Sequence, residues 1–209
     1  MWSIGEHANT SNCNIYVDAE QAYIQGAIES VGQQLTQNFN RGDKHTIVNG
    51  YQSYLKRMKK VITDEVACSK ALGYNLGVKL VRGAYMREER SIAASKGIES
   101  PVCDTIEDTH ASYNWCMEHV LHNLDEDSLL MIASHNFDTI EKAKAVMDKL
   151  NIKDRRVHFG QLKGFSDQIT GSLAQQDYRV FKYVPFGPTE TVLPYLVRRG
   201  QESRQVLRE

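Results

Sequence analysis

The sequence near the C-terminus of the chain is Lys182-Tyr183-Val184-Pro185-Phe186-Gly187-Pro188. This pattern is typical of a strand that ends in a Pro/Gly turn, and a helical pattern follows it directly. That helix carries four polar side chains at helical spacing, namely Tyr195, Arg198, Arg199 and Glu202. A strand end that leads into a ligand-binding helix is how α/β barrels build their sites. The stretch therefore favours a barrel-like α/β fold.

Arg198 and Arg199 have two alternative roles. Both lie on the side of the helix that carries Tyr195, so two permanently charged, fork-shaped donors adjoin a phenol. Such a group suits a small carboxylate, and Glu202 can hold Arg198 in place from one turn away. An arginine pair is also typical of a solvated helix face, because most charged side chains are exposed. The strand and turn upstream favour carboxylate binding.

Short apolar runs rich in β-branched residues alternate with helical patterns along the chain. The runs that we predict to be strands cover residues 14–17, 46–48, 78–82, 129–133, 157–159 and 180–182. Helical patterns include residues 20–39, 52–72, 86–98, 106–121 and 140–146. This alternation predicts a parallel sheet with right-handed crossovers. Two helical patterns between residues 86 and 121 exceed what one crossover needs, so we expect an extra, lid-like helix there.

Six βα units are two fewer than a closed (βα)8 barrel contains, and that fold usually takes about 250 residues. Residues 1–13 lack the pattern of a strand and a helix, so they form an atypical N-terminal segment before six units at 14–209. In the barrel interpretation, the first two strands lie N-terminal to Met1. A doubly wound open sheet is the alternative, but its GxGxxG turn is absent.

Composition and charge exclude several classes of protein. The 209 residues are 41% hydrophobic and 24% charged, which is enough for one domain with a core. The net charge of -1 gives no long-range attraction to nucleic acid. No run approaches the roughly 20 apolar residues of a transmembrane helix, and peripheral membrane contact stays open.

The cysteines and the N-terminus bear on cellular location. Cys13, Cys68, Cys103 and Cys116 form no CxxC pair, so we expect free thiols in a reducing compartment and no zinc site. Residues 1–7 carry no recognisable targeting signal. Either the protein stays where it is made, or a targeting segment is missing from this chain.

Polar side chains follow the predicted strands, and the carboxyl ends of parallel strands meet at one edge of a sheet. The set is Asp18, Asn49, Lys79 or Arg82, Tyr85, His135, Asn136, Gln161 and Tyr183, joined by Tyr195, Arg198 and Arg199. Cations, phenols and amides dominate it. It therefore suits anionic, partly aromatic ligands, whereas a divalent metal needs clustered carboxylates or histidines. We predict no metal site.

Each of these residues also has a structural alternative. Asp18 can cap the helix that follows it, and His135 can be a satisfied structural histidine. Tyr183 can bury its ring in the core. Lys79 lies in an apolar strand, where an unpaired charge costs several kcal/mol, so a role facing a ligand is favoured. Glycines after three strands fit either close approach of a cofactor or an ordinary turn: Gly83, Gly160 and Gly187.

Five segments together resemble the eukaryotic proline dehydrogenase (proline oxidase) family. They are 78–85 (VKLVRGAY), 133–136 (ASHN), 159–164 (FGQLKG), 182–188 (KYVPFGP) and 195–202 (YLVRRGQE), and 17–21 (VDAEQ) fits as well. They occur in the family's order with family-like spacing and extend over nearly the whole chain from Ile15 on. The combination is specific, whereas any single segment is not.

The resemblance implies a distorted (βα)8 TIM barrel that lacks its first two strands in this chain and binds FAD non-covalently. It implies oxidation of L-proline to Δ1-pyrroline-5-carboxylate. Electrons would pass to a quinone, with peripheral association at the mitochondrial inner membrane. Two further hypotheses stay open. One is a hydroxyproline-preferring enzyme, and the other is a truncated, non-catalytic product that binds a full-length partner.

The resemblance also implies roles for individual residues. Arg198 and Arg199, supported by Glu202, would bind the proline carboxylate. The walls around the proline ring would be Tyr85, Leu162, Tyr183 and Tyr195. Lys79 would lie near flavin N5, with Asp18 close to the ring and to Tyr183, and these three form the predicted catalytic set. The other predicted flavin contacts are Asn49, Arg82, Gly83, Ala133, Ser134, His135, Asn136 and Gln161. Related hydroxyproline dehydrogenases carry a smaller residue at position 183, so the Tyr183 phenol favours proline.

Overall fold

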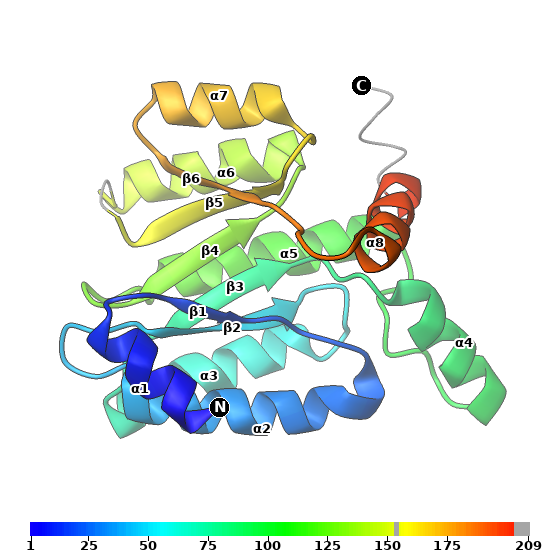
Figure 1. Cartoon of the computed structure of the whole chain (residues 1–209), viewed down its shortest axis with the longest axis horizontal. Helices are drawn as coiled ribbons and strands as arrows, with labels where there is room; N and C mark the ends of the chain where they lie inside the picture. The colour runs from blue at the N-terminus through cyan, green and yellow to red at the C-terminus, as the bar shows by residue number, and fades with distance from the viewer. Residues whose placement is uncertain (153–154, 203–209) are drawn as a thin grey trace.

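The structure is a computed structural model that describes residues 1–152 and 155–202, without the side chains of Arg198, Gln201 and Glu202. Strands and helices alternate along this part of the chain (Figure 1). The strands are β1 (Ile15–Val17), β2 (Ile47–Gln52), β3 (Gly77–Val81), β4 (Leu129–Ala133), β5 (Val157–Leu162) and β6 (Arg179–Tyr183). The helices are α1 (Trp2–Thr10), α2 (Ala22–Phe39), α3 (Met58–Leu72), α4 (Met86–Lys96), α5 (Ile106–Leu121), α6 (Phe137–Lys149), α7 (Asp167–Gln175) and α8 (Thr189–Glu202).

The strands form one sheet in the order β1-β2-β3-β4-β5-β6, and every neighbouring pair is parallel. The sheet is strongly curled. Neighbouring strands lie about 4.8 Å apart, so β1 and β5 are roughly 19 Å apart along the sheet. Nevertheless the hydroxyl of Tyr16 on β1 lies 3.2 Å from Nδ1 of His158 on β5. The six strands are therefore a curled half-barrel, which confirms the predicted α/β class with parallel strands.

The main core lies between the convex face of the sheet and the helices. Side chains alternate between the two faces of a strand, so Val78 and Leu80 of β3 face the helices while Lys79 faces the concave side. Val78 and Leu80 are at most 1% exposed and pack with Ile62 of α3 and Met117 of α5. A smaller apolar cluster fills the concave side: Val48, Leu129 and Met131, with Tyr16 and Ala133 against them.

The N-terminal segment differs from the prediction. Residues 2–10 form helix α1, although the sequence lacks a helical pattern there. Gly5 lies against the ring of Phe39 on α2, and an added Cβ would come within 2.5 Å of that ring. The Trp2 and Phe39 ring centroids are 5.4 Å apart. Residues 1–13 thus contain a helix but no strand, and the helix contacts a distant residue that the local sequence pattern does not show.

Strand β2 is longer than predicted. It continues through Asn49 and Gly50 to Gln52, and helix α3 begins only at Met58. Glycine weakens a strand, so Gly50 resembles a strand end in the sequence. Here a Cβ at Gly50 would lie 2.9 Å from the Val17 carbonyl oxygen, and the glycine allows close approach of β1. The predicted strand 129–133 and the two helices between β3 and β4 are confirmed.

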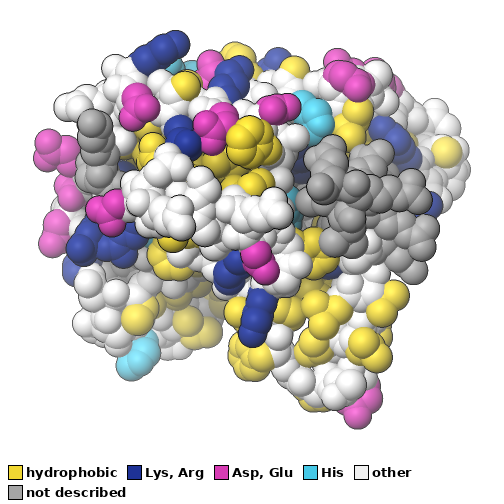
Figure 2. Space-filling view, turned by 90° about the horizontal axis from the view of Figure 1, so that it is seen from above, with side chains coloured by type: hydrophobic (Ala, Val, Ile, Leu, Met, Phe, Trp, Pro, Cys, Tyr) yellow, Lys and Arg dark blue, Asp and Glu magenta, His cyan; other side chains and the backbone are white. Residues whose placement is uncertain are grey.

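Helices α4 and α8 extend beyond the carboxyl ends of the strands (Figure 1). Among the described residues, no helix is both long and apolar enough to cross a bilayer. Acidic and basic side chains are interspersed on the face shown in Figure 2.

Gly83 is expected to tolerate no side chain. It follows β3 with φ +125°, and an added Cβ would lie 1.4 Å from the ring of Tyr54. We predict that Gly83→Ala lowers the free energy of unfolding by about 3 kcal/mol or more, through strain and overpacking. Gly26→Ala on α2, where nothing lies within 4 Å, should instead raise it by about 1 kcal/mol. Urea unfolding measures both, and a Gly83→Ala protein as stable as the wild type would contradict this packing.

Candidate active site

The carboxyl ends of the parallel strands bring together residues that are far apart in the sequence. Each strand is in register with its neighbour in the same direction, so all six ends lie at one edge of the sheet. Helix α8 begins just after β6 at this edge (Figure 1). The residues at or just after the strand ends are Asp18, Gln52, Arg82, Ser134, Leu162 and Tyr183.

An ion pair joins β3 to the loop after β1. The Lys79 Nζ lies 2.5 Å from Oδ1 of Asp18. The lysine side chain is only 15% exposed, whereas that of Asp18 is 56% exposed. Tyr16 also contributes, since the Lys79 Nζ is 6.0 Å from its ring centroid. The charge of Lys79 on the concave face is thus compensated, while its carboxylate partner remains accessible to a ligand.

Arg82 connects several elements around the end of β4. Its Nη1 donates to the Ser134 hydroxyl at 2.6 Å, and its Nη2 donates to the Thr139 hydroxyl at 2.8 Å. Its guanidinium lies 4.3 Å from the centroid of the Tyr113 ring. Burial lowers the pKa of Arg82, although an arginine stays charged at neutral pH. Arg82 therefore holds a fixed positive charge beside the predicted cofactor residues after β4.

His135 is a neutral histidine with an assigned tautomer. Its Nε2 accepts the backbone N–H of Leu162 at 3.0 Å, so the proton resides on Nδ1. Burial, with the charges of Lys182 and Arg82, lowers the pKa of His135 to about 4. The ring offers an N–H donor at neutral pH. Asn136 has a structural role, because its Oδ1 accepts the Thr139 N–H at 2.8 Å and caps α6.

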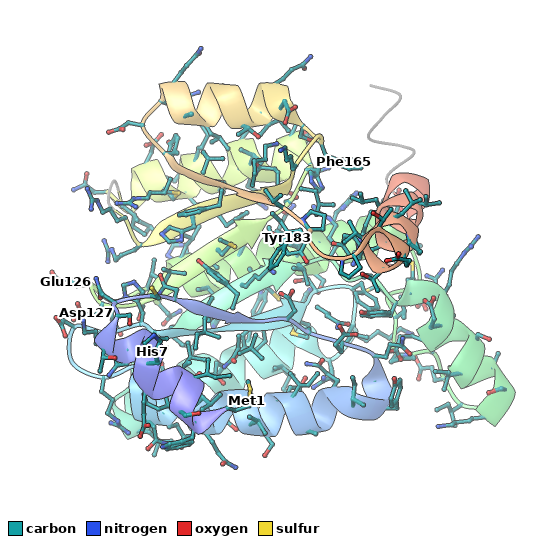
Figure 3. All side chains as sticks on the ribbon, viewed as in Figure 1. Met1, His7, Glu126, Asp127, Phe165 and Tyr183 are labelled. Carbon is teal, nitrogen blue, oxygen red and sulfur yellow. The ribbon has the colours of Figure 1, made fainter. Side chains whose placement is uncertain are left out.

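The predicted substrate residues of β6 and α8 lie together. The Tyr183 and Tyr195 ring centroids are 6.2 Å apart, and the Arg199 guanidinium is 5.2 Å from the Tyr195 ring centroid. Tyr183 lies at the end of β6 next to α8 (Figure 3). Burial raises the pKa of Tyr183, and the negative charge of Asp18 adds to the effect. The side chains of Arg198 and Glu202 lie outside the described residues. The rings border a hollow lined by Tyr183, Val184, Pro185, Phe186, Thr191, Val192 and Tyr195.

Two predicted flavin contacts face the helices instead. Asn49 lies within β2, and its Nδ2 donates to Thr36 of α2 at 2.8 Å. Gln161 is 2% exposed and accepts the Thr170 hydroxyl of α7 at 3.1 Å. The structure thus bonds these two side chains to helices α2 and α7, and their contact with a flavin stays a prediction. The physical reason for this orientation is the alternation of strand faces, which puts Asn49 in register with the core residue Val78.

The remaining predicted contacts have mixed surroundings. At position 83 only glycine fits, because the ring of Tyr54 occupies the place of a Cβ. Ala133 packs against the apolar cluster on the concave side. The Ser134 hydroxyl accepts from Arg82 and from the Asn136 N–H at 3.1 Å. These residues shape the site through packing and hydrogen bonds within the protein.

Gln52 lies at the same edge of the sheet and was not among the residues singled out from the sequence. It ends β2, is 3% exposed, and donates from Nε2 to the Glu20 carbonyl at 2.7 Å. Its Oε1 is buried and has no hydrogen-bond partner within the described ranges. An unmade bond of this kind costs about 1–3 kcal/mol, so this oxygen is suited to a donor on a ligand. A strand extended to residue 52 would have revealed it.

His158 gives a pH-dependent stability. Burial and the charge of Arg179 lower its pKa to about 4, against a usual value of 6.5. Below that usual value the unfolded chain binds a proton that the folded chain does not, so stability falls as the pH falls from 6.5 toward 4. We predict that His158→Gln reduces the loss of unfolding free energy between about pH 7.5 and 5 by roughly 2 kcal/mol.

Urea unfolding at several pH values measures this effect. His7 on α1 is exposed, so His7→Gln is the matched control and should leave the pH dependence unchanged. An identical pH dependence in wild type and His158→Gln would show that His158 titrates normally in the folded chain.

The family model described as "Proline dehydrogenase" matches residues 1–208. "Proline dehydrogenase 1, mitochondrial" from Homo sapiens is 41% identical over 209 residues, which cover 98% of this chain and 35% of that protein. A hydroxyproline dehydrogenase from Xenopus laevis is 35% identical, over 98% of this chain and 45% of that protein. The chain thus spans less than half the length of these curated relatives.

Solved structures are similar too. Proline utilization A (PutA) from Bdellovibrio bacteriovorus, inactivated by N-propargylglycine, has a TM-score of 0.84 at 26% identity. The match covers 91% of this chain and 20% of that chain. The curled parallel sheet with its alternating helices is therefore the barrel-like α/β fold of that protein. From its sequence match over residues 1–208, the chain belongs to the proline dehydrogenase family.

Proposed function

We propose that this chain carries the strand-end site of a proline dehydrogenase, which oxidises L-proline to Δ1-pyrroline-5-carboxylate with FAD as cofactor and a quinone as final acceptor. One observation carries the proposal. Arg199, Tyr195 and Tyr183 form a cationic and aromatic group whose Tyr183 end lies close enough to Asp18 for its charge to act on the phenol. Asp18 in turn is paired with Lys79. Arg199, which can bind a carboxylate, and the rings of Tyr183 and Tyr195 therefore lie near a second cation, Lys79.

The residues at the strand ends fit a flavin. An isoalloxazine ring presents carbonyl and ring-nitrogen acceptors and one N–H donor along its edge. The edge of the sheet offers the Lys79 ammonium, the His135 Nδ1–H and the Gln52 Oε1, an oxygen without a partner in the described part of the chain, and these groups suit that mixture. When bound, the FAD supplies the hydride acceptor for the C5–H of proline. The positive charge of Lys79 would favour a reduced, negatively charged ring.

The protein's own contribution is binding and orientation. Hydride transfer needs fixed geometry more than an acid-base pair, and rigid aromatic walls supply it. Arg199, together with the predicted partner Arg198, would bind the proline carboxylate, while Tyr195, Tyr183 and Leu162 would enclose the ring. The raised pKa of Tyr183 keeps the phenol protonated at neutral pH, so this residue serves as a wall rather than a base. Asp18 is the accessible carboxylate at the same place.

The proposed location rests on the names of relatives. Several similar proteins are named mitochondrial, from Homo sapiens, Caenorhabditis elegans and Bos taurus among others. That naming supports a mitochondrial location for this chain. The quinone acceptor and the peripheral contact with the inner membrane belong to the proposal.

An anaerobic flavin titration tests the proposed activity. We predict that the 209-residue chain binds FAD and that L-proline bleaches its visible absorption. Arg199→Met should raise the proline concentration for half-bleaching at least about 100-fold, because a charge-assisted carboxylate contact is worth about 3 kcal/mol. Arg87→Met on the exposed face of α4 is the matched control. A folded chain with bound FAD that proline does not bleach would refute the activity.

Substrate choice is tested at position 183. Relatives named hydroxyproline dehydrogenase are 35–37% identical, so 4-hydroxyproline is the second candidate substrate. The Tyr183 phenol occupies space beside Tyr195, which favours proline over an analogue with an added ring hydroxyl. We predict that Tyr183→Ser shifts the ratio of kcat/KM values toward 4-hydroxyproline at least about tenfold, as removal of a steric clash allows. A wild type that prefers 4-hydroxyproline would reverse the assignment.

A further inference from the structure

Two hydrogen bonds connect helix α4 to the loop between β1 and α2. The hydroxyl of Tyr85, the residue just before α4, donates to the carboxylate of Glu20. One turn further along, Oε1 of Glu89 accepts the backbone N–H of Ala22 at 2.8 Å. Tyr85 and Glu89 are four residues apart, so they lie on the same side of the helix start. Each makes a bond to the same short loop.

The burial of Glu89 is unusual for its helix. Its neighbours Arg87, Glu88 and Arg90 are exposed, whereas Glu89 is only 3% exposed. Carboxylates are rarely buried without a partner. Here the partner is the N-terminus of α2, where backbone N–H groups lack helical acceptors and the helix dipole is positive. The N-cap residue Gln21 makes no side-chain cap bond, so Glu89 caps α2 from another helix.

The same loop holds the ion pair of the site. Asp18 at its start is paired with Lys79, and the Glu20 carbonyl accepts from Gln52. The Glu20 N–H donates to Gln25 at 2.7 Å. Residues 18–22 therefore join the concave side of the sheet to Tyr85 and the first turn of α4. A shift of the loop would move the partner of Lys79 and the partner of Tyr85 together.

We propose that Glu20 and Glu89 are positioning residues, which hold Tyr85 and the start of α4 over the strand-end site. Neither touches the substrate in this assignment. Glu20 fixes the Tyr85 hydroxyl, and Glu89 fixes the helix from which Tyr85 extends. The inference rests on the proposed function, because Tyr85 is a predicted wall of the proline ring. When the Tyr85 side chain is held in place before the substrate binds, less free energy is spent on ordering it during binding. Loss of the hydrogen bonds that hold it should therefore weaken substrate affinity more than turnover.

Hydrogen exchange on the 209-residue chain tests the connection without any substrate. Glu89→Ala removes the acceptor for Ala22, Glu89→Gln keeps an acceptor oxygen, and the exposed Glu88→Ala is the matched control. We expect the Ala22 amide to exchange at least about tenfold faster in Glu89→Ala and near the wild-type rate in the other two. Unchanged exchange in Glu89→Ala would overturn the role of Glu89.

Proline kinetics with the FAD-loaded chain test the effect on the site. We expect Glu20→Ala to raise the KM for proline about tenfold with kcat within about twofold, and Glu20→Gln to restore most of the KM. A fall in kcat at constant KM, or no restoration by glutamine, would overturn the positioning role. If the wild-type chain does not respond to proline at all, the proposed function fails. The Ala22 exchange rates then decide alone whether Glu89 holds the loop.

Discussion

Parallel pairing in sequence order is the constraint on which the rest of this structure depends. Because each strand is parallel to the next, every carboxyl end lies at the same edge of the sheet. Because the sheet is curled, as the contact between Tyr16 and His158 shows, the strand ends are arranged in an arc around its concave side, which we call the mouth. The alternation of side chains completes the arrangement. Apolar residues such as Leu80 pack under the helices, while Lys79 on the same strand reaches the concave side.

Electrostatics at the mouth depend on few groups. Lys79 is neutralised by Asp18, an accessible carboxylate, so the pair can be reorganised by a ligand at modest cost. Arg82 instead donates to the Ser134 and Thr139 hydroxyls and to His110, and no carboxylate within the described residues accepts a hydrogen bond from it. His135 stays neutral, because burial and the charges of Lys182 and Arg82 lower its pKa. The edge therefore favours electron-rich ligands. The loop of residues 18–22 contacts both Lys79, through Asp18, and the start of α4, through Glu20 and Ala22.

Much of this fold is predictable from sequence, since the β-branched runs and helical periods are local signals. The strand at 129–133 has the predicted bounds, and helix α5 likewise ends at Leu121. The failures have tertiary causes. Helix α1 depends on Phe39, and the continuation of β2 past Gly50 depends on the backbone of β1. Neither of these contacts can be seen in the local sequence pattern, because each joins residues far apart in the chain.

The site shows the same division. The side chains of Lys79 and Tyr183 lie on the concave side or at the strand-end edge, and their roles toward a ligand stay predictions. Asn49 and Gln161 bond to helices α2 and α7 instead, because a polar residue near a strand end can face either side. Glu89 could not be predicted at all, since its partner Ala22 is 67 residues away and a charged helix pattern is typical of solvent exposure.

The central claim is that the concave edge around Lys79 binds the flavin. Equilibrium FAD binding, followed by quenching of flavin fluorescence, tests it most directly. The account predicts that Lys79→Met weakens FAD binding at least about tenfold, the loss of roughly 1.4 kcal/mol, while Lys79→Arg retains it. Lys70→Met on the outer helix α3 should bind FAD like the wild type. Wild-type affinity in Lys79→Met, or a folded wild-type chain that binds no FAD, would contradict the account.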